Sequence, residues 1–298
     1  MAPVLLIVFN RPDTTQRVFD QIRLARPAQL FVAADGPRAH KPGEADLCEQ
    51  TRRIVQQVDW PCTVETLFRP TNLGCRRAVS SAIDWFFAQV EAGIVLEDDC
   101  LPEPTFFGYC TELLERYRTD ERVMHISGIT FQAGRPVTGG ASYYFSGFAS
   151  IWGWATWRRA WQHYNVDPTE NARHVALKPP YFNNRVRWLL REIMAGRLDT
   201  WDTQWLITIR RYNGLSIVPR INQIQNIGFG LGATHTVRKP GWLANMVAGP
   251  IDQPLRHPDQ VAINTEADWY DATHIHQQPW YMRVLEAVYF TVLGVLKR

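Results

Sequence analysis

Short runs rich in apolar residues alternate with amphipathic stretches along the first part of the chain. Continuous apolar runs are typical of strands buried on both faces, and apolar positions that recur every three or four residues are typical of helices. The runs predicted as strands are residues 4–9, 29–34, 63–68 and 93–96. The predicted helices begin at Pro12 and span residues 44–58 and 75–89, with Asp13 as the expected N-cap of the first.

Strands and helices that alternate at this spacing predict an α/β fold with a mostly parallel central sheet flanked by helices. Ligands of such sheets bind beyond the carboxyl ends of the strands. The residues that follow the four predicted strands include Arg11, Asp35, residues 72–74 and the pair Asp98–Asp99. We therefore expect these residues to lie along one edge of the sheet.

The second half of the chain is less regular and rich in tryptophan. The predicted elements are helices at 105–117 and 200–212, strands at 123–127 and 215–218, and a glycine-rich loop at 226–235. The last segment, residues 241–298, reads as a C-terminal extension with an amphipathic helix. That helix carries Met282, Leu285, Tyr289, Val292 and Leu296 on one face. Such a helix either docks on the core or makes peripheral contact with a membrane.

Charge and cysteine usage limit the classes of function. The 298 residues include 32 Lys and Arg and 29 Asp and Glu, and this mild balance argues against a nucleic-acid partner. No window holds the ~20 apolar residues that a spanning helix needs, and no signal peptide is evident. The five cysteines are irregularly spaced, which favours free thiols and a cytoplasmic location. The alternative is a peripheral position at the inner face of the membrane.

The acidic run Glu97-Asp98-Asp99 directly follows an apolar strand, with no turn residue between them. Clustered like charges at a sheet end are unfavourable unless a cation joins them. Oxygen ligands select hard cations such as Mn²⁺ or Mg²⁺, which take their other ligands from substrate phosphates. We therefore predict that this run, through Asp98 and Asp99, binds a divalent cation together with the diphosphate of a ligand. The alternative is a solvated or capping acidic turn.

Other charged residues near the predicted edge are candidates for nucleotide binding. Asp35 can accept bonds from a ribose or a base, although its Asp-Gly-Pro context also explains it as a turn residue. Arg76 and Arg77 open a predicted helix, where they can bind phosphate or be solvated. Arg11 can cover a base or a phosphate, or lie on the surface.

Two candidates lie in the second half of the chain. Asp202 stands between Trp201 and Trp205, and its partial removal from water suits a general base. It can equally be a helix N-cap. His235 ends a glycine-rich stretch and can bind a phosphate or a metal, although a lone histidine is more often structural.

In this order, the motifs resemble those of the GT-A glycosyltransferases, most closely the N-acetylglucosaminyltransferase I group and related bacterial sugar transferases. The resemblance runs from about Val4 to about Thr236. It implies that Asp35 binds uracil, Asp99 binds Mn²⁺ and Asp202 is the catalytic base. It also places Trp154 near the donor sugar and His235 in a loop over the donor phosphates. One departure is Thr203, where eukaryotic relatives carry a second acid.

The resemblance implies a GT-A domain over residues 1–240, with a nucleotide-binding half at 1–127 and an acceptor or catalytic half at 128–240. It implies an inverting, metal-dependent hexosyl- or N-acetylhexosaminyltransferase. The expected donor is a UDP-sugar, and the expected acceptor is a saccharide or a lipid-linked saccharide of a bacterial cell envelope. The alternatives are a non-catalytic glycan-binding or scaffolding relative and a nucleotidyltransferase. The nucleotidyltransferase is disfavoured because no glycine-rich basic signature follows the first strand.

Overall fold

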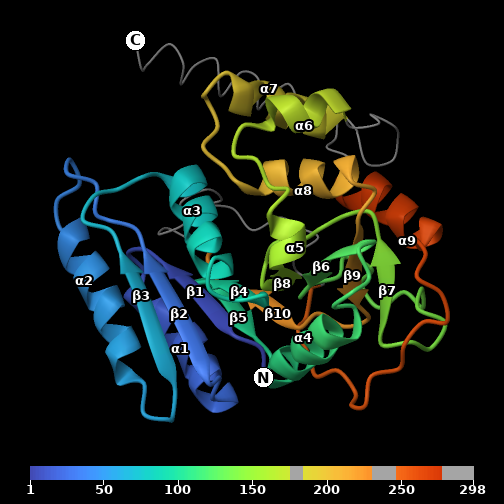
Figure 1. Ribbon diagram of the computed structural model, residues 1–298, viewed down its shortest axis with the longest axis horizontal. Helices are drawn as coiled ribbons and strands as arrows, with labels where there is room; N and C mark the ends of the chain where they lie inside the picture. The colour runs from blue at the N-terminus through green and yellow to red at the C-terminus, as the bar shows by residue number, and fades with distance from the viewer. Residues whose placement is uncertain (175–183, 230–245, 277–298) are drawn as a thin grey trace.

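The computed structural model describes residues 1–174, 184–229 and 246–276. Within them, a mixed sheet has the strand order β3-β2-β1-β4-β8-β6-β9-β7 (Figure 1). Strands β3, β2, β1 and β4 run parallel to one another, β8 runs antiparallel to both β4 and β6, and β7 runs antiparallel to β9. The α/β fold with a mostly parallel sheet is therefore confirmed, and two antiparallel strands interrupt it in the second half.

The strands of this sheet are short and mostly buried. They are β1 Val4–Val8, β2 Gln29–Ala34, β3 Thr63–Phe68, β4 Ala92–Glu97, β6 Val123–Ser127, β7 Tyr143–Ser146, β8 Trp154–Trp157 and β9 Leu215–Pro219. A separate antiparallel pair joins β5 Cys100–Pro102 to β10 Ile224–Asn226. This pair ties the segment after β4 to a segment more than a hundred residues later, so it brings the two halves of the chain together at the acidic run.

Helices cover both faces of the sheet, because successive strand residues point to opposite sides. On one face, the β1 residues Val4, Leu6 and Val8 pack with residues of α1 and α4. On the other face, Leu5 and Ile7 pack with residues of α3, α5 and α8. The helices are α1 Pro12–Ala25, α2 Glu44–Ile54, α3 Cys75–Phe87, α4 Pro104–Arg116, α5 Arg158–Trp161, α6 Pro168–His174, α7 Asn184–Met194, α8 Asp202–Arg211 and α9 Thr265–Tyr270.

The start of α1 differs from the sequence-based prediction. Arg11, not Asp13, is the N-cap, and Pro12 occupies the first helical position. Proline is favoured there because its fixed φ suits the helix and its missing N–H would lack a helical partner anyway. Asp13 lies in the first turn, where a negative charge is favourable to the helix dipole. The shift places the Arg11 side chain at the strand-to-helix turn rather than out on the helix.

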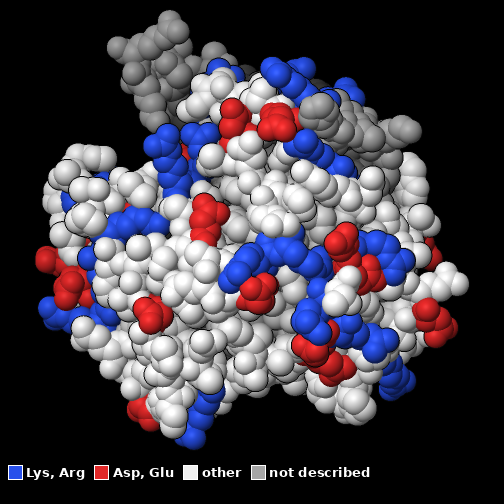
Figure 2. Space-filling view, in the orientation of Figure 1, with Lys and Arg blue, Asp and Glu red and all other residues white. Residues whose placement is uncertain are grey.

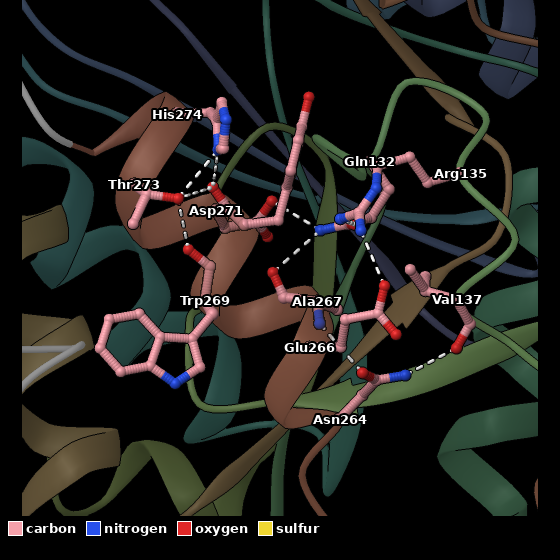
Figure 3. A network of polar contacts seen from close by, with 11 residues as sticks. Gln132, Arg135, Val137, Asn264, Glu266, Ala267, Trp269, Asp271, Thr273 and His274 are labelled. Atoms are coloured by element: carbon pink, nitrogen blue, oxygen red, sulfur yellow. Dashed lines mark hydrogen bonds and ion pairs between the residues drawn. The ribbon is translucent and has the colours of Figure 1, made fainter.

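Residues 246–276 pack on the body of the protein rather than standing apart from it. Ile251 and Leu255 are buried in the core, and Ala267 of α9 packs with residues of β7 and β9. Figure 3 shows the polar contacts that fasten α9 and the following π-turn, Asp271–Ile275. The Gln132 side-chain amide donates to Asp271 (2.7 Å), and Arg135 forms an ion pair with Glu266 (2.7 Å).

The amphipathic helix predicted around residues 282–296 lies outside the described residues. No helix within the described residues is long and apolar enough to cross a membrane. On the face of the molecule in Figure 2, basic and acidic side chains are interspersed over the described surface.

Candidate functional site

The polar residues expected at one edge of the sheet lie at the carboxyl ends of neighbouring strands. Strand register aligns the ends of β2, β1 and β4, so these three strands finish side by side. Arg11 follows β1, Asp35 follows β2, and Asp98–Asp99 follows β4. The fold therefore gathers, at one place, side chains that are far apart in the sequence.

Arg11 links the two aspartates that follow β4. Its guanidinium contacts both Asp98 and Asp99, and the distance from Nη1 of Arg11 to Oδ2 of Asp99 is 3.0 Å. Asp98 is only 2% exposed, and its other oxygen accepts a hydrogen bond from the backbone N–H of Phe9 (3.2 Å). Burial raises the pKa of Asp98, while the charge of Arg11 and both hydrogen bonds oppose that rise. In this structure Arg11 serves the acidic pair, and its predicted contact with a base or phosphate stays a prediction.

Asp99 is the more accessible member of the pair, with an 18% exposed side chain. Its Oδ1 lies 3.5 Å from the Cys100 Sγ, and its Oδ2 receives the Arg11 contact. Among the described residues, no cluster of three or more His, Cys, Asp or Glu side chains could hold a metal. A carboxylate oxygen is the type of ligand that Mn²⁺ and Mg²⁺ prefer, and an ion held by Asp99 alone would take its remaining ligands from water and phosphate.

Glu97 is a member of this edge that the sequence analysis did not select. It is the last residue of β4, two positions after Val95, and so it lies on the face covered by α3 and α8. Burial raises the pKa of Glu97, and Asp99, Asp98 and, more weakly, Asp202 raise it further against the effect of Arg11. The sequence could have indicated this position, because successive residues of a strand point to opposite faces of the sheet. Glu97 therefore lies on the face opposite to Leu96.

Asp202 is the first residue of α8 and approaches the same edge. Its Oδ1 accepts hydrogen bonds from the Thr200 hydroxyl (2.5 Å) and the Thr203 backbone N–H (2.7 Å). The N-cap of α8 is Trp201, so the capping alternative for Asp202 is not what the structure shows. Among the described residues, no donor bonds to Oδ2 of Asp202.

The thiol of Cys75, at the start of α3, lies within electrostatic range of carboxylates from both halves of the chain. Burial raises the pKa of Cys75 well above its ordinary value. The negative charges that raise it further are those of Glu97, Asp199, Asp202 and Asp35. Asp202 therefore belongs to the same electrostatic environment as the residues that follow β2 and β4, although it comes from the other half of the chain.

Asp35 anchors the loop between β3 and α3. Its carboxylate accepts hydrogen bonds from the Asn72 side-chain amide (2.9 Å) and from the backbone N–H groups of Leu73 (3.1 Å) and Gly36 (2.9 Å). Burial raises the pKa of Asp35, and these hydrogen bonds oppose the rise. This geometry supports the turn-forming role, whereas contact with a nucleotide stays a prediction.

The two arginines at the start of α3 differ in their surroundings. Arg76 lies near Asp199, with Nε 3.7 Å from the carboxylate, and its backbone N–H donates to the same oxygen (3.3 Å). Arg77 is exposed. The structure thus places Arg76 beside Asp199 and leaves Arg77 toward solvent. Their phosphate-binding roles stay predictions.

Trp154 lies behind the site rather than on its surface. Its indole is 0% exposed and stacks on His125 (centroids 5.2 Å apart) and on Trp201 (5.7 Å). The expected contact of Trp154 with a donor sugar is therefore corrected, because this ring is fully buried. It packs beneath the residues of the site instead of lining their exposed surface. The stacking on Trp201 helps to fix the position of that residue, which directly precedes Asp202.

The glycine-rich loop is described only as far as Phe229, so His235 lies outside the described residues. Within the described part, Gly228 lies directly against Asp99. Phe229 packs edge-on against Trp152, with ring centroids 5.9 Å apart. Sequence reasoning missed the contact of Gly228 because only the pairing of β5 with β10 creates it.

Comparisons with known proteins are distant. No protein-family model matches the chain, and no curated protein matches it. Among solved structures, HddC from Yersinia pseudotuberculosis is similar at 12% identity, over 43% of this chain and 57% of that one, with a TM-score of 0.30. This chain thus spans little more than half the length of HddC.

Two further solved structures are similar over more of their length. A UDP-glucose pyrophosphorylase complexed with UDP-glucose is 11% identical, over 83% of this chain and 97% of that one, with a TM-score of 0.38. A 4-diphosphocytidyl-2C-methyl-D-erythritol synthase from Anaerococcus prevotii is 7% identical, over 69% and 82%, with a TM-score of 0.35. At these values the likenesses carry no argument about function, and the fold is established by the strand order and register of the protein itself.

Proposed function

We propose that the protein is a metal-dependent glycosyltransferase that moves a sugar from a nucleotide-diphosphate donor, a UDP-sugar, to a saccharide or lipid-linked saccharide. The observation that carries the proposal is the gathering of Asp35, Asp98 and Asp99 at the carboxyl ends of neighbouring parallel strands, with Arg11 paired to both Asp98 and Asp99. Parallel strands bind their ligands at this edge. The ordered motifs that resemble GT-A glycosyltransferases support the same function.

Asp99 is the residue that would hold a Mn²⁺ or Mg²⁺ ion, since its carboxylate is partly exposed at the strand end. Such an ion, when bound, neutralises charge on a departing diphosphate. Asp98 is tied to Arg11 and to the backbone of Phe9, so it fixes the guanidinium beside Asp99. The acidic pair then has one fixed, buried member and one member that faces ligand.

Asp202 would accept the proton of the acceptor hydroxyl. Hydrogen bonds from Thr200 and Thr203 hold Oδ1, so Oδ2 is the oxygen directed to that proton. As the proton moves to Oδ2, the acceptor oxygen forms a bond to the anomeric carbon. The bond from that carbon to the phosphate oxygen breaks, and its electron pair leaves with the nucleoside diphosphate. Attack from the face opposite the leaving group inverts the anomeric centre. General-base catalysis of this kind contributes about 10²–10⁴-fold.

The test separates binding from transfer. Asp202→Asn should still bind Mn²⁺ and UDP-sugar, measured by calorimetry, and should lose transfer, measured as released UDP, by about 10²-fold or more. Asp99→Ala should lose the metal-dependent part of nucleotide binding. Asp167→Asn is the matched control, because Asp167 accepts a bond from a helix N-terminus (Thr169 N, 2.9 Å) and is exposed.

Near-normal transfer by Asp202→Asn would show that the base assignment is wrong.

The donor is identified by a thermal-shift screen of UDP-, GDP- and dTDP-sugars with and without Mn²⁺, because a ligand of the native state raises the melting temperature. Uptake of free saccharide without nucleotide or metal, together with an absence of transfer, would favour the glycan-binding alternative over an enzyme.

A further inference from the structure

Gly228 is held against Asp99 by the backbone of a neighbouring ribbon. Strand β10 pairs antiparallel with β5, and the register places Asn226 opposite Cys100. One residue further on, the backbone N–H of Ile227 donates to the Asp99 carbonyl (2.8 Å). The segment that carries Gly228 is therefore anchored on the residue whose side chain is proposed to hold the cation.

A side chain at position 228 would fit only if the Asp99 side chain moved away. A Cβ built on Gly228 would lie 2.1 Å from Oδ2 of Asp99 and 2.8 Å from its Cγ, closer than real atoms approach. The Asn226 side chain adds to the constraint, because its Oδ1 accepts a hydrogen bond from the Gly228 backbone N–H (2.9 Å). The Gly228 backbone does not adopt a left-handed conformation, so space, not conformation, requires glycine here.

Arg11 approaches the same carboxylate oxygen. Its Nη1 lies 3.0 Å from Oδ2 of Asp99, the oxygen that Gly228 also contacts. Oδ1 lies near the Cys100 thiol at 3.5 Å. The carboxylate thus sits between a guanidinium and a glycine backbone, and these two neighbours together set its orientation.

We propose that Gly228, held by Asn226, is a positioning residue that sets the orientation of the Asp99 carboxylate for a divalent cation. The cation part of this inference rests on the proposed function, whereas the steric restraint between Gly228 and Asp99 does not. A side chain at position 228 pushes the carboxylate out of place, so the cation loses its protein ligand. Groups that orient a metal ligand typically change metal affinity about 10–100-fold when they are altered.

Gly228→Ala tests the cation part. We expect Mn²⁺ affinity in the presence of UDP, measured from the electron paramagnetic resonance of free Mn²⁺, to fall about 10–100-fold. UDP binding without metal should be unchanged, and a purely structural defect would not separate these two affinities. Gly249→Ala is the matched control, since a Cβ there meets nothing closer than Ile221 at 3.5 Å, and it should bind Mn²⁺ as the wild type does. Asn226→Ala should also weaken Mn²⁺ binding, but by a smaller factor. This variant replaces Gly228→Ala in the test if Gly228→Ala does not fold.

A double-mutant cycle without metal tests the restraint itself. Gly228→Ala should lower the melting temperature of the wild type clearly more than that of Asp99→Ala, because the second background lacks the clashing oxygen and carboxyl carbon. Equal losses in both backgrounds, or wild-type Mn²⁺ affinity in Gly228→Ala, would overturn the inference. If the wild type itself binds no Mn²⁺ with UDP, the proposed function fails, and the cycle still decides whether Gly228 restrains Asp99.

Discussion

His125 provides a quantitative test of the aromatic core that supports Asp202. The imidazole is 0% exposed in β6 and stacks on Trp154. Its Nδ1 accepts from the Trp205 indole N–H (3.2 Å), and its Nε2 lies 3.0 Å from the Ser150 carbonyl oxygen. An indole N–H only donates and a carbonyl only accepts, so the ring is neutral with its hydrogen on Nε2. A second proton on Nδ1 would face the Trp205 N–H.

The free energy of unfolding should therefore depend on pH through His125. Burial lowers the pKa of His125 from 6.5 to about 3, and the bond to Ser150 only partly opposes this. Above pH 6.5 the ring is neutral in both states, so it adds no pH dependence. As the pH falls below that value, the unfolded chain takes up a proton that the native state refuses, and stability is lost. At about 1.4 kcal/mol per pH unit, the loss is about 3 kcal/mol near pH 4.5 and about 5 kcal/mol near pH 3.

The assay is urea unfolding of the wild type and of His125→Gln between about pH 7.5 and about pH 4.5. Glutamine cannot titrate, and its amide can accept from Trp205 or donate to Ser150. We expect the variant to be less stable than the wild type at neutral pH and to gain on it by about 3 kcal/mol at the acid end. Other groups titrate in both proteins, so the difference between them isolates position 125. A difference that stays constant with pH would refute the burial argument.

Two further predictions concern buried carboxylates and use the same unfolding measurement. Arg11→Met leaves Asp98 buried without its cation, so we expect a loss of about 3–5 kcal/mol near pH 8 and a smaller loss near pH 5, where protonation removes the charge. An equal loss at both pH values would contradict this. Asp271 has its pKa raised to about 7 by burial and by Asp268, so its ionisation lowers stability as the pH rises through that value. Asp271→Asn keeps the acceptor for Gln132 and should be more stable than the wild type by up to about 4 kcal/mol near pH 8, with no such gain near pH 4.

Much of the first half could be predicted because its signals are local. The predicted strands at 29–34 and 63–68 coincide with β2 and β3. Apolar runs that end at turn residues mark buried strands wherever they occur, and right-handed crossovers then fix which ends share an edge. For this reason, the placement of Asp35 and the acidic pair at one edge could be inferred before any coordinates were known.

Predictions that depended on the exact surroundings of a side chain succeeded less well. The resemblance to GT-A glycosyltransferases placed Trp154 near the donor sugar, yet Trp154 is buried because β8 inserts between β4 and β6. For Arg11 the sequence left open a contact with a base or phosphate and a surface position, and the structure adds ion pairs with two aspartates some ninety positions later. Neither outcome is visible locally, since each depends on which strand becomes the neighbour of which.

The sequence by itself determined the alternating α/β pattern, the edge at which polar residues collect, and the chemical types available there. Only the tertiary structure decided that Arg11 pairs with Asp98 and Asp99, that Asp98 is buried and Asp99 partly open, and that Gly228 lies against Asp99. The physical reason is the separation along the sequence over which each interaction acts. Strand and helix periodicity acts over a few residues, whereas burial, ion pairing and steric contact arise between segments that only the β4–β8 and β5–β10 pairings bring together.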